Sequence, residues 1–204
     1  MAYYPIAMDL TDKTCLIVGG GEVAFRKAVS LREAGARVTI ISPEADPRLA
    51  SLDGVEIIGR AFQPGDTADC ALVFAATDDQ SINSAVSKEA VQHGIPVNVV
   101  DDPDLCSFIV PACVRRGDLL LAVSTSGKSP ALSKRIRIEL ESRYGPEYAD
   151  FVNLLGELRD EVKAKYPSQA DREEVFNRLV DSGILQLFRQ GKKNEAQKKA
   201  RKLI

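Results

Sequence analysis

Short apolar runs alternate with stretches of helical spacing through the first half of the chain. Thr14–Val18 is such a run, and it is followed by glycines, as a buried strand often is. Similar runs predict further strands at Arg37–Ser42, Val55–Ile58, Cys70–Ala75 and Val97–Val100. Helices are predicted at about Glu22–Ala34 and Gln80–Gln92. The alternation indicates right-handed βαβ units, and therefore an α/β fold with a parallel, Rossmann-like sheet covered on both faces.

The pattern changes after the last of these strands. Two apolar runs, Phe108–Val114 and Leu119–Ser124, are separated by a polar spacer that contains Gly117, which predicts a β-hairpin. A helix then begins near Ser129, a suitable N-cap, and runs to about Arg143.

The rest of the chain has helical spacing. An apolar stripe covers Phe151–Val162, and Pro167 interrupts it. The tail Gln190–Ile204 holds six basic residues and one acidic residue with a weak apolar stripe, which predicts a solvated or frayed helix. We therefore expect three parts, an α/β domain at 1–113, a hairpin-and-helix segment at 114–145 and a small all-helical domain at 146–204.

Composition excludes several classes of protein. The 204 residues carry a formal net charge of −2, whereas nucleic-acid-binding domains usually have a large basic excess. No apolar run approaches the roughly 18 residues that span a bilayer. The first residues lack the basic and apolar regions of a signal peptide. We expect a cytoplasmic protein that binds neither nucleic acid nor a membrane.

Histidine and cysteine are too sparse for common metal sites. His93 is the single histidine, and it precedes a glycine at a predicted helix end, where a cation suits the helix dipole. The four cysteines form no Cys-x-x-Cys pair, and three of them lie in apolar stretches, where a thiol behaves as a small hydrophobe. We predict no protein-bound metal.

A glycine motif follows the first predicted strand and opens the first predicted helix. Gly19 permits a tight turn, Gly21 lets a pyrophosphate approach the backbone, and Ala24 allows close packing of helix on strand. The helix N-terminus then offers free N–H groups to the phosphates. In this context the motif predicts dinucleotide binding, with a purely structural glycine turn as the alternative.

The choice between NAD and NADP depends on the end of the second strand. An acidic residue there would bind the adenosine ribose, and Glu44 lies slightly beyond the expected position. No Arg or Lys follows directly to meet a 2′-phosphate, so NAD is favoured. The sequence also lacks the Tyr-x-x-x-Lys pair of short-chain dehydrogenases, and its one histidine leaves no obvious imidazole base.

Carboxylates at strand ends are the natural candidates for a base. In such sheets the ligand lies outside the carboxyl ends of the strands, where Asp78, Asp79, Asp101 and Asp102 follow two of them. Adjacent carboxylates raise one another's pKa, which suits proton transfer. Capping of helices or turns is the alternative role for each of them.

A second anion-binding candidate is the hydroxyl-rich loop Ser124–Pro130. It contains Lys128 and opens onto a predicted helix N-terminus, although its glycine spacing is not that of a Walker loop. The loop fits carboxylates or phosphates, or serves only as a helix cap.

Five segments in this order resemble one known family. They are YYPIAMDL with GGGEVAFRKA, then AATDD, VNVVDDPDLCSFIVPA, RRGDLLLAVSTSGKSPALSKRIR and a helical tail. Together they resemble the siroheme synthase family, specifically its precorrin-2 dehydrogenase/sirohydrochlorin ferrochelatase module. The resemblance is strong to about Arg143 and rests on pattern beyond it.

The resemblance implies NAD-dependent oxidation of precorrin-2 to sirohydrochlorin by a homodimer, with 114–145 as a dimerisation segment. It implies Asp101 as the general base, with Asp102 as the competing residue. The expected cofactor contacts are Gly19, Gly21, Glu22, Val23, Pro43, Glu44 and Thr77. The expected substrate contacts are Ser107, Thr125, Ser126, Lys128, Ser129 and Arg135.

Two alternatives to this assignment stay open. Some family members also insert Fe²⁺ into the product, and the residues neither support nor exclude that step. In a different class of function, the chain is a regulatory module that senses NAD(H) without tetrapyrrole chemistry.

The two parts of the chain differ in charge. Residues 1–113 hold 8 basic and 16 acidic residues, whereas residues 114–204 hold 19 basic and 13 acidic residues. The basic excess begins at the hairpin and its helix. A tetrapyrrole with many carboxylates would find its counter-charges there, and an ordinary solvated face is the alternative.

Overall fold

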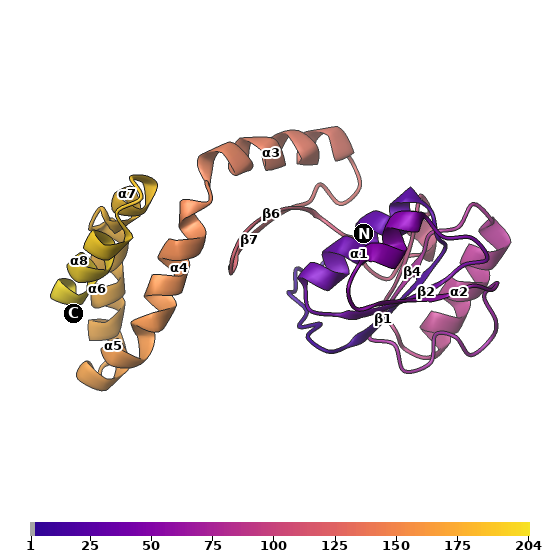
Figure 1. Cartoon of the computed structure of the whole chain (residues 1–204), viewed down its shortest axis with the longest axis horizontal. Coiled ribbons are helices and arrows are strands. Elements are labelled where there is room, and N and C mark those ends of the chain that lie inside the picture. Colours follow the sequence, from indigo (N-terminus) through magenta and orange to yellow (C-terminus); the bar gives the residue numbers. More distant parts are fainter. Residues whose placement is uncertain (1–2) are drawn as a thin grey trace. The chain divides into compact units, whose positions relative to one another are not determined.

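The computed structural model describes residues 3–204, and contacts within the chain divide it into two compact units, Met1–Val110 and Pro111–Ile204 (Figure 1). The predicted boundaries at residues 113 and 145 stay predictions.

The first unit is built on a five-stranded parallel sheet in the order β3-β2-β1-β4-β5. The strands are β1 (Thr14–Val18), β2 (Arg37–Ile41), β3 (Val55–Ile58), β4 (Leu72–Ala75) and β5 (Val97–Val99). The helices of this unit are α1 (Glu22–Glu33) and α2 (Gln80–Gln92), with short 3₁₀ helices at Pro47–Ser51 and Pro103–Leu105. The predicted Rossmann-like sheet is therefore confirmed.

Each face of this sheet has its own apolar core. Cys15 and Ile17 of β1 lie in the core that includes Ala24 and Ala28 of α1. Residues on the other face of the strands pack with Val86 of α2. Burial on both faces explains why the strands read as continuous apolar runs rather than as alternating patterns.

The second unit begins with the predicted hairpin and helix. Strands β6 (Ala112–Arg116) and β7 (Leu119–Val123) pair antiparallel, and α3 (Pro130–Arg143) follows. The expectation that the first hairpin strand begins at Phe108 is wrong. The Phe108 ring packs edge-on against the Phe74 ring, with centroids 5.6 Å apart, so its apolar character serves the core of the first unit.

Five helices complete the second unit around one apolar core. They are α4 (Glu147–Glu157), α5 (Arg159–Lys165), α6 (Gln169–Asp181), α7 (Ile184–Arg189) and α8 (Lys193–Leu203). The basic tail is packed rather than frayed, because Ala196 and Ala200 of α8 are fully buried. The Ile204 carbonyl also accepts hydrogen bonds from Lys165 Nζ at 2.5 Å and the Tyr166 hydroxyl at 2.6 Å.

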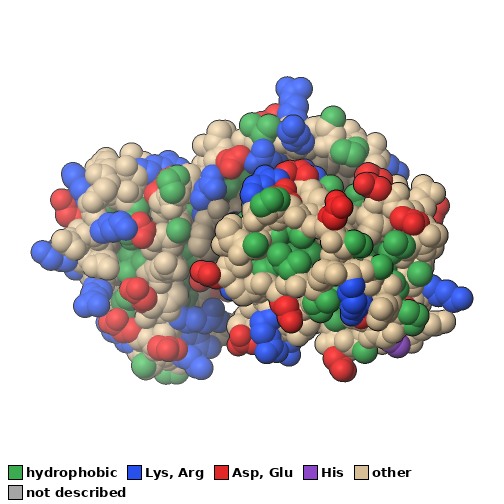
Figure 2. Space-filling model, turned by 45° about the vertical axis from the view of Figure 1, so that its right-hand side comes forward, with side chains coloured by type: hydrophobic (Ala, Val, Ile, Leu, Met, Phe, Trp, Pro, Cys, Tyr) green, Lys and Arg blue, Asp and Glu red, His purple; other side chains and the backbone are tan. Residues whose placement is uncertain are grey.

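Charges are mixed on the surface. Figure 2 shows Lys and Arg side chains interspersed with Asp and Glu side chains over the visible face. No helix within residues 3–204 combines the length and the apolar character that crossing a membrane would require.

Candidate functional site

The turn that follows β1 is held closely against the rest of the sheet. Gly19 has φ +117°, and a Cβ there would lie 2.6 Å from the Ala76 carbonyl carbon. Its N–H donates to the Ile41 carbonyl at 2.9 Å. Gly19 therefore meets two requirements that only glycine satisfies, a left-handed backbone and contact with the end of β4.

Gly20 is a structural residue that the sequence motif does not reveal. A Cβ on Gly20 would lie 2.8 Å from Ala45 Cα and would overlap the Glu44 carbonyl. The Gly20 carbonyl accepts a hydrogen bond from Asp46 N at 2.8 Å. The middle position of the motif thus fixes the loop after β2 against the glycine turn. In the sequence, only the run of three glycines could have indicated this role of Gly20.

Gly21 differs from its neighbours because it faces open space. A Cβ on Gly21 would meet no atom within 4 Å, and this residue is the N-cap of α1 without a side-chain cap. The first N–H groups of α1, at Glu22 and Val23, therefore begin a helix that no capping side chain covers. Ala24 is fully buried against the sheet. This arrangement is a cradle in which a pyrophosphate can approach the backbone.

The loop after β2 carries Glu44, the residue predicted to bind the adenosine ribose. Pro43 and Glu44 are exposed, and the Ser42 hydroxyl donates to the Glu44 carbonyl at 2.5 Å. This bond and the contact with Gly20 fix the backbone at Glu44 beside the glycine turn. The Glu44 carboxylate makes no ion pair with any residue in 3–204.

Arg48 is the basic residue nearest along the chain to this loop, and it is already neutralised. Its guanidinium pairs with Glu22, contacts Asp46 at 2.5 Å and stacks 4.3 Å from the Phe25 ring centroid. Hydrogen bonds from the side chain and backbone of Arg48 lower the pKa of Asp46 to about 2. The Glu22 carboxylate is thus directed to Arg48, and only its N–H remains for a cofactor.

Thr77 shapes the turn after β4. Its hydroxyl donates to Asn83 Oδ1 at 2.8 Å, and Asn83 Nδ2 donates to the Thr77 carbonyl at 2.9 Å. Asp79 accepts from the Ser81 hydroxyl at 2.5 Å and caps α2 by accepting from Ser81 N at 2.8 Å and Ile82 N at 3.3 Å, and these bonds lower its pKa. Asp79 therefore has the capping role, and Asn83 is a further residue that sequence reasoning missed.

The predicted base lies in a strained backbone conformation. Asp101 is exposed at the end of β5 with φ +61°. The other non-glycine residues with positive φ in the described chain are Asp12, Asp69 and Ser126. Such conformations are uncommon and concentrate at functional sites, although Asp tolerates them better than most residues. Asp102 instead opens the following 3₁₀ helix without capping it through its side chain.

The Cys106 thiol holds the loop that carries Asp101. Val99 N donates to Cys106 Sγ at 3.1 Å, and Sγ lies 3.2 Å from both the Val99 and the Asp102 carbonyl oxygens. Burial raises the pKa of this thiol, so it stays a neutral donor. Sequence reasoning assigned the cysteines only a packing role and missed this contact.

Ser107 is bonded to the sheet. Its hydroxyl accepts from Val97 N at 2.8 Å and contacts the Val97 carbonyl at 3.2 Å, while the residue stays exposed. Its predicted contact with substrate stays a prediction.

The hydroxyl-rich loop of the second unit is an ordered helix cap. Ser129 Oγ accepts from Leu132 N at 3.3 Å, and Thr125 Oγ1 accepts from Ser129 N at 3.0 Å and contacts Ser133 Oγ at 3.1 Å. Lys128 is exposed at its tip.

Two other predicted substrate contacts lie in or just after this loop. Ser126 has φ +53°, and its N–H bonds to Ser124 Oγ at 3.0 Å. Arg135 pairs with Glu139 at 3.3 Å on the exposed face of α3.

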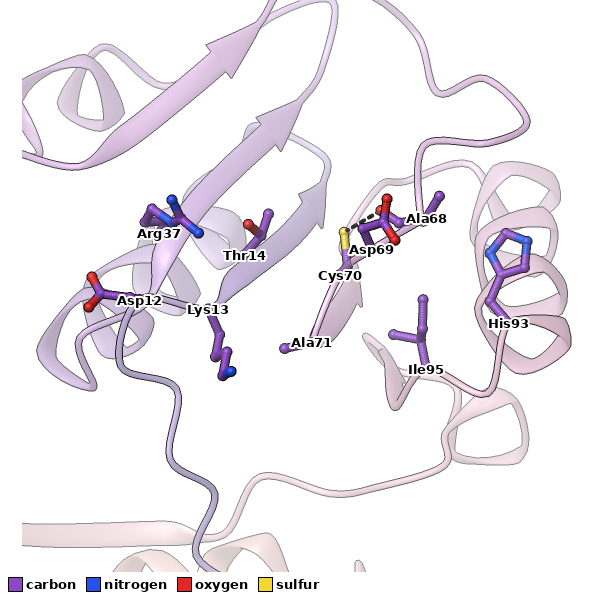
Figure 3. A pocket seen from close by; sticks show the side chains of 10 residues that line it. All are labelled: Asp12, Lys13, Thr14, Arg37, Ala68, Asp69, Cys70, Ala71, His93 and Ile95. Carbon is purple, nitrogen blue, oxygen red and sulfur yellow. Dashed lines mark hydrogen bonds between the residues drawn. The ribbon is translucent and has the colours of Figure 1, made fainter.

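A hollow of about 650 Å³ lies in the first unit at the amino edge of the sheet, opposite the carboxyl edge that carries the glycine turn (Figure 3). Thr14 and Arg37, which begin β1 and β2, line it together with His93. His93 is the C-cap of α2, as its position before a glycine predicts, and its Nδ1 lies 3.1 Å from Thr67 Oγ1. The hollow contains none of the predicted site residues, so the carboxyl edge of the sheet is the better candidate site.

Three family descriptions together match almost the whole chain. Residues 6–112 match "Putative NAD(P)-binding", residues 116–143 match "Sirohaem biosynthesis protein central", and residues 147–204 match "Sirohaem synthase dimerisation region".

Curated relatives and a solved structure agree with these matches. The siroheme synthase of Thioalkalivibrio sulfidiphilus is 40% identical over 100% of this chain, and that of Methylococcus capsulatus is 40% identical over 97%. The chain spans 42% of the length of each of these relatives. The solved structure of "SirC, precorrin-2 dehydrogenase" is similar with a TM-score of 0.76 and 26% identity, covering 98% of this chain and 100% of that one.

Proposed function

Because the chain belongs to the siroheme synthase family, we propose that it oxidises precorrin-2 to sirohydrochlorin with NAD as the acceptor. The observation that carries this proposal is the likeness to a precorrin-2 dehydrogenase along nearly the full length of both chains. The open glycine turn supports it independently, since it fits a dinucleotide.

The chain holds the cofactor through backbone groups at the start of α1. NAD, when bound, supplies the hydride acceptor. Gly19 and Gly20 shape the turn, and Gly21 leaves room for the pyrophosphate at the N–H groups of Glu22 and Val23. The cofactor contacts predicted at Pro43 and Thr77 are part of the same proposal.

NAD rather than NADP is favoured by the charges after β2. Glu44 is exposed and makes no ion pair within residues 3–204, so its carboxylate suits a ribose hydroxyl but repels a 2′-phosphate. Arg48 would be the natural partner of that phosphate, but Glu22 and Asp46 already neutralise it.

Asp101 takes the proton that leaves the tetrapyrrole. Strands β1 and β5 run parallel in one sheet, so Asp101 and the glycine turn lie at the same carboxyl edge. The exposed carboxylate is free to accept a proton from a bound substrate, and the Cys106 thiol keeps its loop in place.

The substrate contacts and the assembly complete the proposal. The proposed contacts with tetrapyrrole carboxylates include the Ser107 hydroxyl in the first unit. In the second unit they are the basic groups of Lys128 and Arg135 and the hydroxyl groups of Thr125, Ser126 and Ser129. The match of 147–204 to a dimerisation region supports a homodimer. We place this enzyme in the cytoplasm.

The proposed reaction is tested by mixing the protein with precorrin-2 and NAD without oxygen. The absorbance of sirohydrochlorin and of NADH should rise together. Binding of NAD without turnover would favour the sensing module instead. Adding Fe²⁺ or Co²⁺ to preformed sirohydrochlorin, with the uncatalysed reaction as control, tests the metal insertion, which the residues neither support nor exclude.

Replacing Glu44 tests the cofactor assignment. Glu44→Gln should raise the KM for NAD about threefold to tenfold, because a charged hydrogen bond to the ribose becomes a neutral one. It should also narrow the preference for NAD over NADP, measured as the ratio of the two kcat/KM values. The matched control is Glu56→Gln on β3, which is also exposed. Equal KM values in Glu44→Gln and the wild type would exclude a ribose contact.

A further inference from the structure

Lys27 is an amine held in an apolar setting inside the first unit. It lies on α1, six residues after Gly21, and its side chain is largely removed from solvent. Its Nζ lies 5.1 Å from the centroid of the Phe74 ring, and the Phe108 ring packs edge-on against Phe74. Burial lowers the pKa of Lys27, and the neighbouring Arg26 lowers it further.

No carboxylate compensates this amine. Within residues 3–204, the Lys27 ammonium makes neither an ion pair nor a hydrogen bond, and its one specific contact is with the Phe74 ring. Every fully buried side-chain N or O atom in that range has a hydrogen-bond partner. Since the Lys27 Nζ has none, it is not fully buried and keeps some contact with solvent.

Lys27 lies beside the loop that carries the predicted base. The Cys106 thiol is close enough to Lys27 for each to act on the pKa of the other. The same sulfur lies 3.2 Å from the Asp102 carbonyl, next to Asp101 in the chain. The Lys27 amine is therefore near the carboxyl edge of the sheet, between α1 and the segment that follows β5.

A half-buried amine without an anion is energetically unfavourable, so a functional reason for it is expected. The Cys106 thiol is not that anion, because burial raises its pKa and keeps it neutral. We propose that Lys27 binds a carboxylate of the tetrapyrrole and so orients the ring toward Asp101. This inference rests on the proposed function, and it adds a specificity residue on α1 to the predicted contacts.

The test compares three variants of the full chain. Lys27→Met removes the charge and keeps the length of the side chain, and a Met sulfur packs well on an aromatic ring. Lys27→Arg keeps the charge. Arg26→Met is the matched control, since it removes the same charge from the exposed neighbouring position on the same helix.

Lys27→Met should raise the KM for precorrin-2 about tenfold or more, with kcat within about threefold and the KM for NAD unchanged. Lys27→Arg should restore most of the loss, and Arg26→Met should behave as the wild type. Lys27→Met should also keep or raise the Tm. Removing a cation that stabilises the fold would lower the Tm, whereas removing one that serves only binding would not. A KM for precorrin-2 within twofold of the wild type would overturn the proposal. A KM for NAD that rises more than the KM for precorrin-2 would overturn it as well.

Direct titration with sirohydrochlorin separates this inference from the proposed function. If the wild type binds sirohydrochlorin without oxidising precorrin-2, the proposed function fails, and the affinities of the variants still decide the role of Lys27. If the wild type turns over and Lys27→Met binds sirohydrochlorin equally well, only the role of Lys27 fails. A wild type that binds no tetrapyrrole overturns both.

Discussion

Asp101→Asn is expected to lower the kcat for precorrin-2 oxidation by about 10²- to 10⁴-fold, the usual contribution of a positioned general base. Asn is the right replacement because it tolerates the left-handed backbone at φ +61°, whereas Ala would add strain to the loss of the carboxylate. The Kd for NAD and the Tm should stay near those of the wild type, since Asp101 is exposed. Stopped-flow absorbance of NADH under anaerobic conditions measures the step.

Asp102→Asn is the matched control for this prediction. The Asp102 side chain caps nothing, and only its backbone carbonyl bonds to the Cys106 thiol, so the substitution should leave kcat within about threefold. If Asp102→Asn loses activity and Asp101→Asn keeps it, the base is Asp102. If both lose activity equally, the two carboxylates act as a coupled pair.

The fold of the first unit was largely predictable because local signals agreed with the tertiary structure. The glycines after β1 and the apolar runs of the strands predict the same order of strand, turn and helix, and the structure confirms that order. The start of β6 was not predictable. Phe108 belongs by pattern to the next apolar run, and only the position of the Phe74 ring assigns it to the sheet core.

The candidate site was predictable where function constrains the residue type. Gly21 follows from the glycine motif and Asp101 from the family resemblance, and both roles stay predictions. Gly20 and Lys27 were missed because their contacts, with the loop after β2 and with Phe74, are distant in sequence. Cys106 was missed because its thiol was read as apolar, although it bonds to Val99 and Asp102 nearby in the chain. Lys27 in particular reads as a solvated helix position, and only its contact with the Phe74 ring of β4, which is distant in sequence, shows that the amine lies over the sheet core.

Gly21→Val is expected to raise the Kd for NAD on the order of 100-fold while the protein stays folded. The reason is geometric. Gly21 has φ −83°, an ordinary value for any residue, and the Cβ of a valine there would meet no protein atom within 4 Å, so the side chain projects into the room left for the pyrophosphate. Titration with NADH, followed by fluorescence, measures the affinity of the variant, and urea unfolding measures its stability.

Gly20→Ala, one residue earlier in the same turn, is expected to lower the stability of the fold rather than the affinity for NADH. Its Cβ would overlap the Glu44 carbonyl and lie 2.8 Å from Ala45 Cα, so the loop after β2 must shift, at a cost of roughly 1–3 kcal/mol in the free energy of unfolding. Gly21→Val should therefore lose affinity with its stability nearly kept, and Gly20→Ala should lose stability first. If Gly21→Val instead unfolds as readily as Gly20→Ala and binds NADH normally after refolding, the space above Gly21 is not the cofactor site, and the alternative of a purely structural glycine turn is correct.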